Sequence, residues 1–348
     1  MFKSFTIRDL TIDPPLALAP MSGVTNVAFR LLIRALNDKA VGLVVSEFIS
    51  IEGLTRDSLR SHQMLRRHKS ERPLSIQIFG ADVGRMADAA KIVEQSGADI
   101  VDINCGCPAP KVVKKGGGCE LMRKPVELAK ILSAARAAIK IPLTLKIRSG
   151  WDQDSLNAVE VAKIAEECGV EAIAVHGRTR AQLYRGLADW SVVAAVVDAV
   201  KIPVLGSGDV VCRDSAAERL AVSGASGVMI GRAALANPWV FSEILDGVKR
   251  FNSPNQRSLA LLEMLSRYVD ILLEYFAEHV IVGKLKQIVS QACKKERWKT
   301  ELLRASSFKE QCETMSRLKE IFLEDDFLGK SISSTKASPL IGNVNQSF

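Results

Sequence analysis

The run Ile-Val-Asp-Ile-Asn-Cys-Gly-Cys-Pro at residues 100–108 decides the fold class. Its apolar, β-branched start is typical of a buried strand. Gly106 and Pro108 end that strand, because proline cannot donate to a sheet ladder and glycine lets the backbone approach a ligand closely. Cys105 and Cys107 are too close in sequence for a zinc pair, which normally has about two to four residues between its ligands. We therefore expect a strand whose end faces a ligand; two buried structural thiols are the alternative.

Similar apolar runs recur along the chain and alternate with helical patterns. The expected strands are 16–19, 42–46, 74–79, 100–104, 143–147, 172–175, 202–205 and 227–230. Helical spacing of apolar residues marks 83–96, 126–139, 156–168 and 215–223. Strand–helix alternation predicts a parallel sheet. Eight such units in ~235 residues favour a closed (β/α)₈ TIM barrel over an open doubly wound sheet, and no Gly-x-Gly-x-x-Gly pattern follows the first strand.

The pattern changes near the C-terminus. After Phe241 no strand is expected, Ser253-Pro254-Asn255 is predicted to be a linker, and helices are expected over 259–276, 282–298 and 307–322. The chain is therefore predicted to be an α/β protein with a TIM barrel at 1–245 and a small helical bundle at 255–328. Residues 330–348 are rich in Ser, Thr, Asn and Gly, which predicts a disordered tail.

Composition limits the class of protein. The 348 residues include 47 basic and 39 acidic side chains, a net charge of +8. This charge suits a polyanionic partner, although a solubilising surface explains it equally well. No apolar run reaches the ~18 residues of a membrane span, and no signal-type segment follows the first residues, so a cytoplasmic protein is expected. The 7 cysteines lack a disulfide spacing.

The active site of such a barrel lies where its strands end. The candidate residues at these ends are Met21, Glu47, Gln77, Asn104, Cys107, Lys146, His176, Ser207 and Arg232. Most of them also have a structural explanation, such as satisfying nearby backbone groups. Lys146 is harder to explain in that way, because burying an unpaired ammonium inside Leu-Thr-Leu-Lys-Ile is costly.

The last two strand ends predict a phosphate site. Gly206-Ser207-Gly208 and Gly231-Arg232 combine exposed backbone N–H groups, a helix start and a guanidinium. Gln77, Asn104 and Lys146 could bind a polar heterocycle deeper in the barrel. Flavin mononucleotide (FMN) fits this division, but a sugar phosphate or pyridoxal phosphate would fit it equally well.

Basic residues crowd the same loops and the helical region. Those of the loops are Arg56, Arg60, Arg66, Arg67, Lys69, Lys111, Lys114, Lys115, Arg148, Arg178, Arg180 and Arg185. Residues 284–304 are also rich in Lys and Arg and contain Trp298. Either group alone is usually a solvated face. A basic rim together with a basic helical appendage suits a large nucleic-acid substrate.

Five motifs in order are similar to those of tRNA-dihydrouridine synthases, particularly the bacterial B type. They are residues 19–26, 102–108, 145–151, 176–190 and 231–234, and the resemblance covers about residues 10–245. It implies an FMN enzyme, and separately we expect a monomer that binds no metal. Such an enzyme reduces a uridine of tRNA, expected in the D-loop, to 5,6-dihydrouridine with NADPH or NADH.

The resemblance also implies residue roles. Cys107 would be the general acid, and Cys105 a bystander. The flavin would contact Pro20, Met21, Ser22, Gln77, Lys146, His176, Ser207, Gly208, Asp209, Gly231 and Arg232. The tRNA would contact Asn104, Lys111, Arg148 and Arg178 in the barrel. Lys294 and Lys295, in the basic helical region that the resemblance does not cover, are also expected to contact it. A hydride would reach C6 of the extruded uracil, and a proton from the Cys107 thiol would reach C5. A thiol suits this proton transfer because its reference pKa is ~8.5.

Two other functions fit parts of this pattern. An FMN dehydrogenase of free dihydropyrimidines, such as dihydroorotate, would share the barrel, the flavin and the cysteine turn. The basic rim and the helical bundle argue against it. A non-catalytic tRNA-binding protein would share the basic surfaces, but the presence of Cys107 and Lys146 argues against that function.

Overall fold

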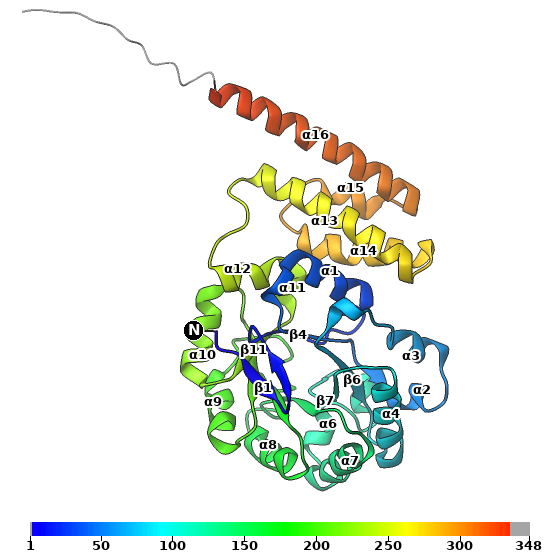
Figure 1. Cartoon of the computed structure of the whole chain (residues 1–348), viewed down its shortest axis with the longest axis vertical. Helices are drawn as coiled ribbons and strands as arrows, with labels where there is room; N and C mark the ends of the chain where they lie inside the picture. Colours follow the sequence, from blue (N-terminus) through cyan, green and yellow to red (C-terminus); the bar gives the residue numbers. More distant parts are fainter. Residues whose placement is uncertain (1, 335–348) are drawn as a thin grey trace, which may run out of the picture. The chain divides into compact units, whose positions relative to one another are not determined.

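The structure is a computed structural model that describes residues 2–334, with side chains to 324 (Figure 1). The chain divides into two compact units after Val248. Of the predicted tail, 330–334 form the end of the last helix, and 335–348 lie outside the described residues.

The first unit contains a closed parallel barrel, which confirms the predicted fold class. Its strands are β3 (Leu16–Leu18), β4 (Leu43–Val45), β6 (Leu74–Phe79), β7 (Ile100–Cys105), β8 (Leu143–Arg148), β9 (Ala172–His176), β10 (Val204–Ser207) and β11 (Gly227–Ile230). They pair in sequence order, and β11 pairs with β3 to complete the ring. The short β5 (Ile49–Ser50) extends the pairing at the end of β6. All eight predicted strands are present.

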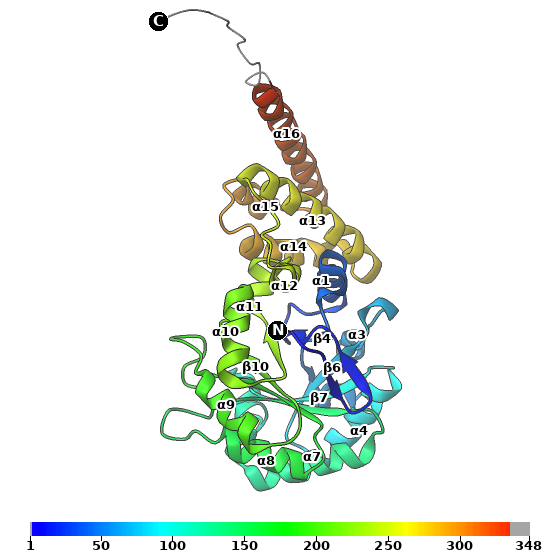
Figure 2. The same ribbon diagram turned by 60° about the vertical axis from the view of Figure 1, so that its left-hand side comes forward.

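Helices surround the barrel (Figures 1 and 2). Those between or after the strands are α1 (Val27–Asn37), α2 (Ile51–Leu54), α3 (Leu59–Met64), α4 (Val83–Gln95), α5 (Pro110–Val113), α6 (Cys119–Met122), α7 (Pro125–Ala138), α8 (Ala158–Glu167), α9 (Trp190–Ala199), α10 (Arg213–Ser223), α11 (Arg232–Ala236) and α12 (Val240–Asp246), with 3₁₀ turns η1 (Asp38–Ala40) and η2 (Lys69–Glu71). Side-chain caps fix several starts: Asp82 Oδ1 accepts from Arg85 N–H at 2.8 Å at the start of α4.

An N-terminal hairpin that the sequence analysis did not anticipate closes the amino end of the barrel. It pairs β1 (Phe5–Ile7) with β2 (Leu10–Ile12). Ile7 and Ile12 are buried in one apolar cluster with the first residues of three barrel strands, Leu43, Ile100 and Ala172. A cavity of only about 20 Å³ remains where Ile7 meets the barrel interior.

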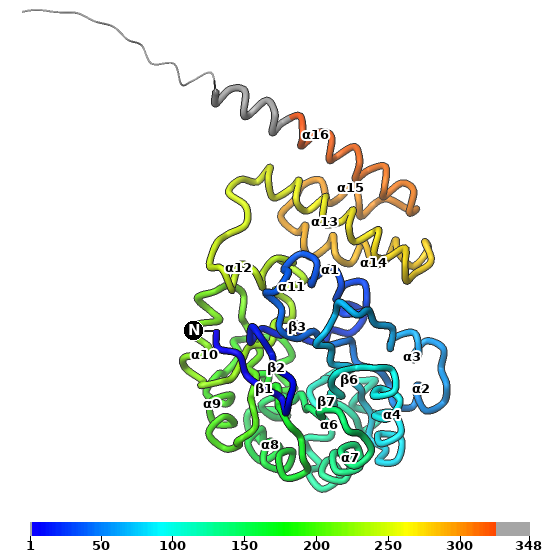
Figure 3. Tube along the Cα trace, in the orientation of Figure 1, coloured from blue at the N-terminus to red at the C-terminus, as the bar shows by residue number. Residues whose placement is uncertain are grey.

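The second unit is helical, as predicted (Figure 3). It contains α13 (Pro254–Tyr275), α14 (Glu278–Ala292), α15 (Lys299–Arg304) and α16 (Phe308–Ser334), with α13 packed against α14 and α16. The predicted linker at 253–255 is wrong: Ser253 Oγ caps Gln256 N–H at 3.1 Å, and Pro254 occupies the first helical turn, where its missing N–H costs nothing. Among the described residues no helix is long and apolar enough to cross a bilayer.

A fully buried ion pair joins α1 to the segment before β6. Glu71 Oε1 lies 2.6 Å from Arg30 Nε, and its Oε2 accepts from His68 N–H at 2.6 Å. Arg30 also donates to the carbonyls of Thr25 and Arg66. Removing the carboxylate would leave a buried guanidinium without its counter-charge.

We expect Glu71→Ala to lower the free energy of unfolding by about 3–5 kcal/mol, measured by urea denaturation. The control is Asp88→Ala, which breaks an exposed pair with Lys91 and should change stability by less than about 1 kcal/mol. Equal effects of the two substitutions would contradict this ranking.

Candidate active site

A cavity of about 360 Å³, here called the mouth cavity, opens at the carboxyl ends of β3, β9, β10 and β11. Nine of the residues predicted to contact the flavin line it: Pro20, Met21, Lys146, His176, Ser207, Gly208, Asp209, Gly231 and Arg232. The other two do not line it. Ser22 is exposed, and Gln77 is buried in a hydrogen-bond chain described below.

Buried charge dominates the inner wall of the mouth cavity. Burial, and then the nearby Arg148, lower the pKa of Lys146 to about 8. Burial and the surrounding cations, first Lys146, lower the pKa of His176 to about 2. The imidazole of His176 is therefore neutral at physiological pH and acts as a hydrogen-bonding group. The Lys146 ammonium is still mostly protonated at pH 7, but its pKa lies only slightly above that pH.

The opposite end of the mouth cavity is built around Asp209. Gly208 before it has φ of 123°, and a Cβ there would lie 2.5 Å from the Cβ of Ala188, so the position requires glycine. Arg178 Nη2 donates to both carboxylate oxygens of Asp209 at 2.8 Å. Burial opposes ionisation of Asp209, but the Ala188 N–H and Arg178 outweigh it and hold its pKa below the usual value.

Arg232 is the more accessible cation at this end. Its side chain is 54% exposed and lies 3.5 Å from Asp209 Oδ1. The guanidinium also lies 4.6 Å from the centre of the Tyr184 ring. Arg232 is the first residue of α11, where the N–H groups of Arg232 and Ala233 have no acceptor within the helix. The arrangement suits an anionic group held by Arg232 and backbone donors.

A chain of hydrogen bonds fixes the turn that carries Cys107. Asn104 Oδ1 accepts from Cys107 N–H at 2.9 Å and from Gly106 N–H at 3.2 Å. Asn104 Nδ2 donates to Gln77 Oε1 at 2.7 Å, and Gln77 Nε2 donates to Asp102 Oδ2 at 2.5 Å. The second oxygen of Asp102 accepts from the Thr144 hydroxyl at 2.6 Å. Donors and acceptors therefore alternate from the barrel interior to the thiol turn.

The thiol of Cys107 is nearly buried, with 8% of the residue exposed. Burial raises its pKa above the usual range, although the Ala109 backbone and the charges of Arg148, Lys111 and Lys146 act in the opposite direction. The group is therefore a protonated thiol at neutral pH. The nearby cations would stabilise the thiolate that remains after it gives up a proton.

Two arginines predicted to contact substrate donate extensively to backbone carbonyls. Arg148 Nε donates to Gly106 O at 2.9 Å, and its Nη1 donates to Thr179 O and Leu183 O. Arg178 Nη2 donates to Gly186 O at 2.6 Å besides binding Asp209. Both side chains are 2% exposed and hold loops in place around the site.

The other residues predicted to contact the substrate do not line the mouth cavity. Asn104 belongs to the hydrogen-bond chain, and Lys111 is exposed on α5. Lys294 and Lys295 follow α14 in the second unit. Sequence reasoning missed Asp102 and gave Tyr184 no role. The signal available for Asp102 was its place inside an apolar strand. A carboxylate buried there needs hydrogen-bond donors from neighbouring side chains.

Asn104→Asp tests the direction of the hydrogen-bond chain. The substitution keeps the acceptor for Cys107 N–H but removes the donor to Gln77. If the side-chain amide of Gln77 turned so that its nitrogen donated to the new carboxylate at position 104, its oxygen would face the Asp102 carboxylate. Two acceptors would then face each other without a hydrogen bond. We expect the free energy of unfolding to fall by about 1–3 kcal/mol in urea denaturation.

A second substitution, Asp102→Asn, should rescue this variant. The amide introduced at position 102 would donate to Gln77, so the two bonds through Gln77 would form in the reversed direction, while Cys107 N–H and the Thr144 hydroxyl would donate as before. We therefore expect the double variant to be more stable than Asn104→Asp alone, a coupling that a double-mutant cycle measures. A double variant no more stable than that single one would contradict the directional chain.

Comparison with known proteins identifies the family. The family model of dihydrouridine synthases (Dus) matches residues 17–325. The chain is 46% identical over 238 residues to tRNA-dihydrouridine synthase B of Pseudomonas syringae pv. tomato, covering 68% of this chain and 70% of that one. It is 42% identical over 279 residues to the Pseudomonas aeruginosa protein of the same name, covering 80% and 81%.

A solved structure supports the fold alone. The complex of 2-naphthoyl-CoA reductase with 2-naphthoyl-CoA matches with a TM-score of 0.54 at 15% identity, covering 71% of this chain and 52% of that chain. The sequence relationships go further, because the family match spans most of the chain and both Pseudomonas relatives are named as type B. This protein therefore belongs to the dihydrouridine synthase family and is of its bacterial B type.

Proposed function

We propose that this protein is an oxidoreductase that reduces the C5–C6 double bond of a uridine in tRNA to 5,6-dihydrouridine. FMN would carry the electrons, and NADPH or NADH would supply them. The uridine is expected in the D-loop and the enzyme in the cytoplasm, as a monomer without metal. The observation that carries the proposal is the buried, protonated thiol of Cys107, held at the rim that also carries the mouth cavity. The names of the relatives support tRNA as the substrate.

The residues of the mouth cavity fit FMN. Within residues 2–324 no carboxylate lies at ion-pair distance from the Lys146 ammonium, an arrangement that ring oxygens of a bound flavin would relieve. Met21 and Gly231 both line the mouth cavity, and a Cβ on Gly231 would lie 3.8 Å from Met21 Sδ, so the glycine leaves room there that a side chain would take. Arg232 would hold the phosphate, and reduced FMN would supply the hydride for C6 of the uracil.

Cys107 would complete the reduction by giving its proton to C5. The reaction then balances, because C6 gains a hydride, C5 gains a proton and the sulfur is left as a thiolate. Lys146 and Arg148, whose charges act on this sulfur, would stabilise the thiolate until solvent reprotonates it. Neutral His176 would offer a hydrogen bond to the flavin without adding charge.

We expect Cys107→Ala to retain flavin and tRNA binding but to lose dihydrouridine formation by about a hundred-fold or more, since general-acid catalysis contributes 10²–10⁴-fold. Its matched control, Cys105→Ala, removes a neighbouring buried thiol and should keep most of the activity. Single-turnover reduction of tRNA measures both. The wild-type rate should fall at alkaline pH, as the thiol deprotonates above its raised pKa. Loss of flavin from Cys107→Ala would contradict the assigned role.

The reaction itself is tested by incubating the flavin-loaded protein with NADPH and tRNA from a strain lacking this gene, then mapping dihydrouridine by mass spectrometry. Dihydrouridine at defined positions supports the proposal. Turnover of free dihydroorotate without any product on tRNA would support the small-molecule dehydrogenase instead. A colourless protein that cannot be reloaded with flavin would support a non-catalytic binding protein.

The basic second unit is proposed to bind the tRNA backbone through Lys294 and Lys295. Charge reversal, Lys294→Glu with Lys295→Glu, should weaken tRNA binding without changing the flavin spectrum. The wild-type affinity should fall steeply as salt rises, because phosphate contacts release counterions. Titrations at several salt concentrations measure both effects, with Lys309→Glu on α16 as the charge-reversal control. An affinity independent of salt would contradict this proposal.

A further inference from the structure

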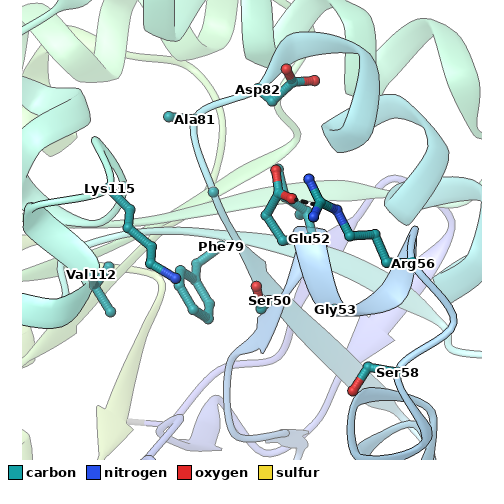
Figure 4. Close-up of a pocket in the computed structure, with 13 residues that line it drawn as sticks. Ser50, Glu52, Gly53, Arg56, Ser58, Phe79, Ala81, Asp82, Val112 and Lys115 are labelled. Atoms are coloured by element: carbon teal, nitrogen blue, oxygen red, sulfur yellow. Dashed lines mark ion pairs between the residues drawn. The ribbon is translucent and has the colours of Figure 1, made fainter.

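A second cavity, of about 600 Å³, lies at the same end of the barrel as the mouth cavity (Figure 4). Residues at 50–58, 79–82 and 112–117 line it, at the ends of β5 and β6 and in the loop after β7. It shares no lining residue with the mouth cavity. Its volume is within the range of about 300–1,000 Å³ typical of ligand sites.

The wall of the second cavity adjoins the reactive thiol. Gly117 lines the cavity, and a Cβ added to the next residue, Gly118, would lie 3.2 Å from the Cβ of Cys107. Cys119 N–H donates to Cys107 O at 3.1 Å. Residues 117–119 alone therefore separate the second cavity from the turn that carries the Cys107 thiol.

One part of this cavity is aromatic. Phe79, at the end of β6, contributes its ring, and Phe48 packs against that ring edge to face at a centroid distance of 5.1 Å. Val112 adds an aliphatic surface from the loop after β7. A ring braced in this way suits stacking with a planar heterocycle.

Two carboxylates and two cations line the cavity, and one of the cations has no carboxylate partner among the described residues. Glu52 is already paired with Arg56 at 3.1 Å and with Arg85 at 3.2 Å, and Asp82 caps α4. Lys115, by contrast, is exposed and forms no ion pair with any described carboxylate. In Figure 4 the Lys115 and Arg56 side chains reach toward the cavity from different loops.

We propose that the second cavity binds a nucleotide of the tRNA next to the uridine that is reduced. Its base would stack on Phe79, and its phosphate would contact Lys115 and Arg56. This proposal rests on the proposed function: because residues 117–119 adjoin both Cys107 and the cavity, the neighbour of a uracil that reaches this thiol would lie within reach of the cavity. An aromatic platform beside cations is the usual means of binding single-stranded nucleotides.

Two variants test this proposal through the dissociation constant for tRNA, measured at several salt concentrations. Lys115→Gln removes one phosphate contact, so the slope of log affinity against log salt should become shallower by about 0.7. Phe79→Leu removes the stacking platform and should raise the dissociation constant by about five-fold to a hundred-fold. Lys130→Gln, the same change on the outer helix α7, should leave both quantities at the wild-type value.

Flavin content and thermal unfolding will show that each variant is folded. Combined, Lys115→Gln and Phe79→Leu should lose less affinity than the product of their separate effects, because both contact one nucleotide. Wild-type affinity and salt slope in both variants would overturn the proposal. So would a raised KM for NADPH with unchanged tRNA binding, which would assign the cavity to the nicotinamide nucleotide. A wild-type protein that forms no dihydrouridine would instead overturn the proposed function.

Discussion

Two backbone N–H groups, those of Gly106 and Cys107, set the direction of the side-chain hydrogen bonds that run from their turn through Asn104 and Gln77 to Asp102. A backbone N–H can only donate, so Asn104 must present its oxygen to the turn and its nitrogen to Gln77. Gln77 must then donate to Asp102, which can accept. The position of the thiol thus depends on the carboxylate of Asp102, which lies two residues before Asn104 on β7 and is joined to it through Gln77 of β6. Unpaired polar groups in such a chain would be costly.

The same barrel interior explains which functional residues could be predicted. Because parallel strands end at one edge, side chains that follow strands converge on one mouth, and the residues predicted from strand ends such as Lys146, His176 and Ser207 indeed line one cavity. The N-terminal hairpin was not predictable in this way, since its two antiparallel strands precede the strand–helix alternation and do not end at the mouth. The start of α13 was missed because Ser-Pro suits a helix start as well as a loop.

Charged residues of the motifs were harder to assign. Arg148 and Arg178 lie in motifs that face the site, yet their donors bind backbone carbonyls of the loops around it. Irregular loops leave carbonyls without sheet or helix partners, and a guanidinium with five donors can satisfy several at once. A sequence cannot show whether such a group faces a ligand or a loop. These cations nevertheless contribute to the field that keeps His176 neutral.

The hairpin that packs Ile7 and Ile12 under the barrel has a kinetic consequence. With that end plugged by aliphatic side chains, the reductant and the RNA of the proposed reaction would both have to arrive through the remaining opening. A nicotinamide and a uracil that need the same flavin from one side would take turns there. Catalysis would then proceed as two half-reactions, with departure of the first product preceding entry of the second substrate.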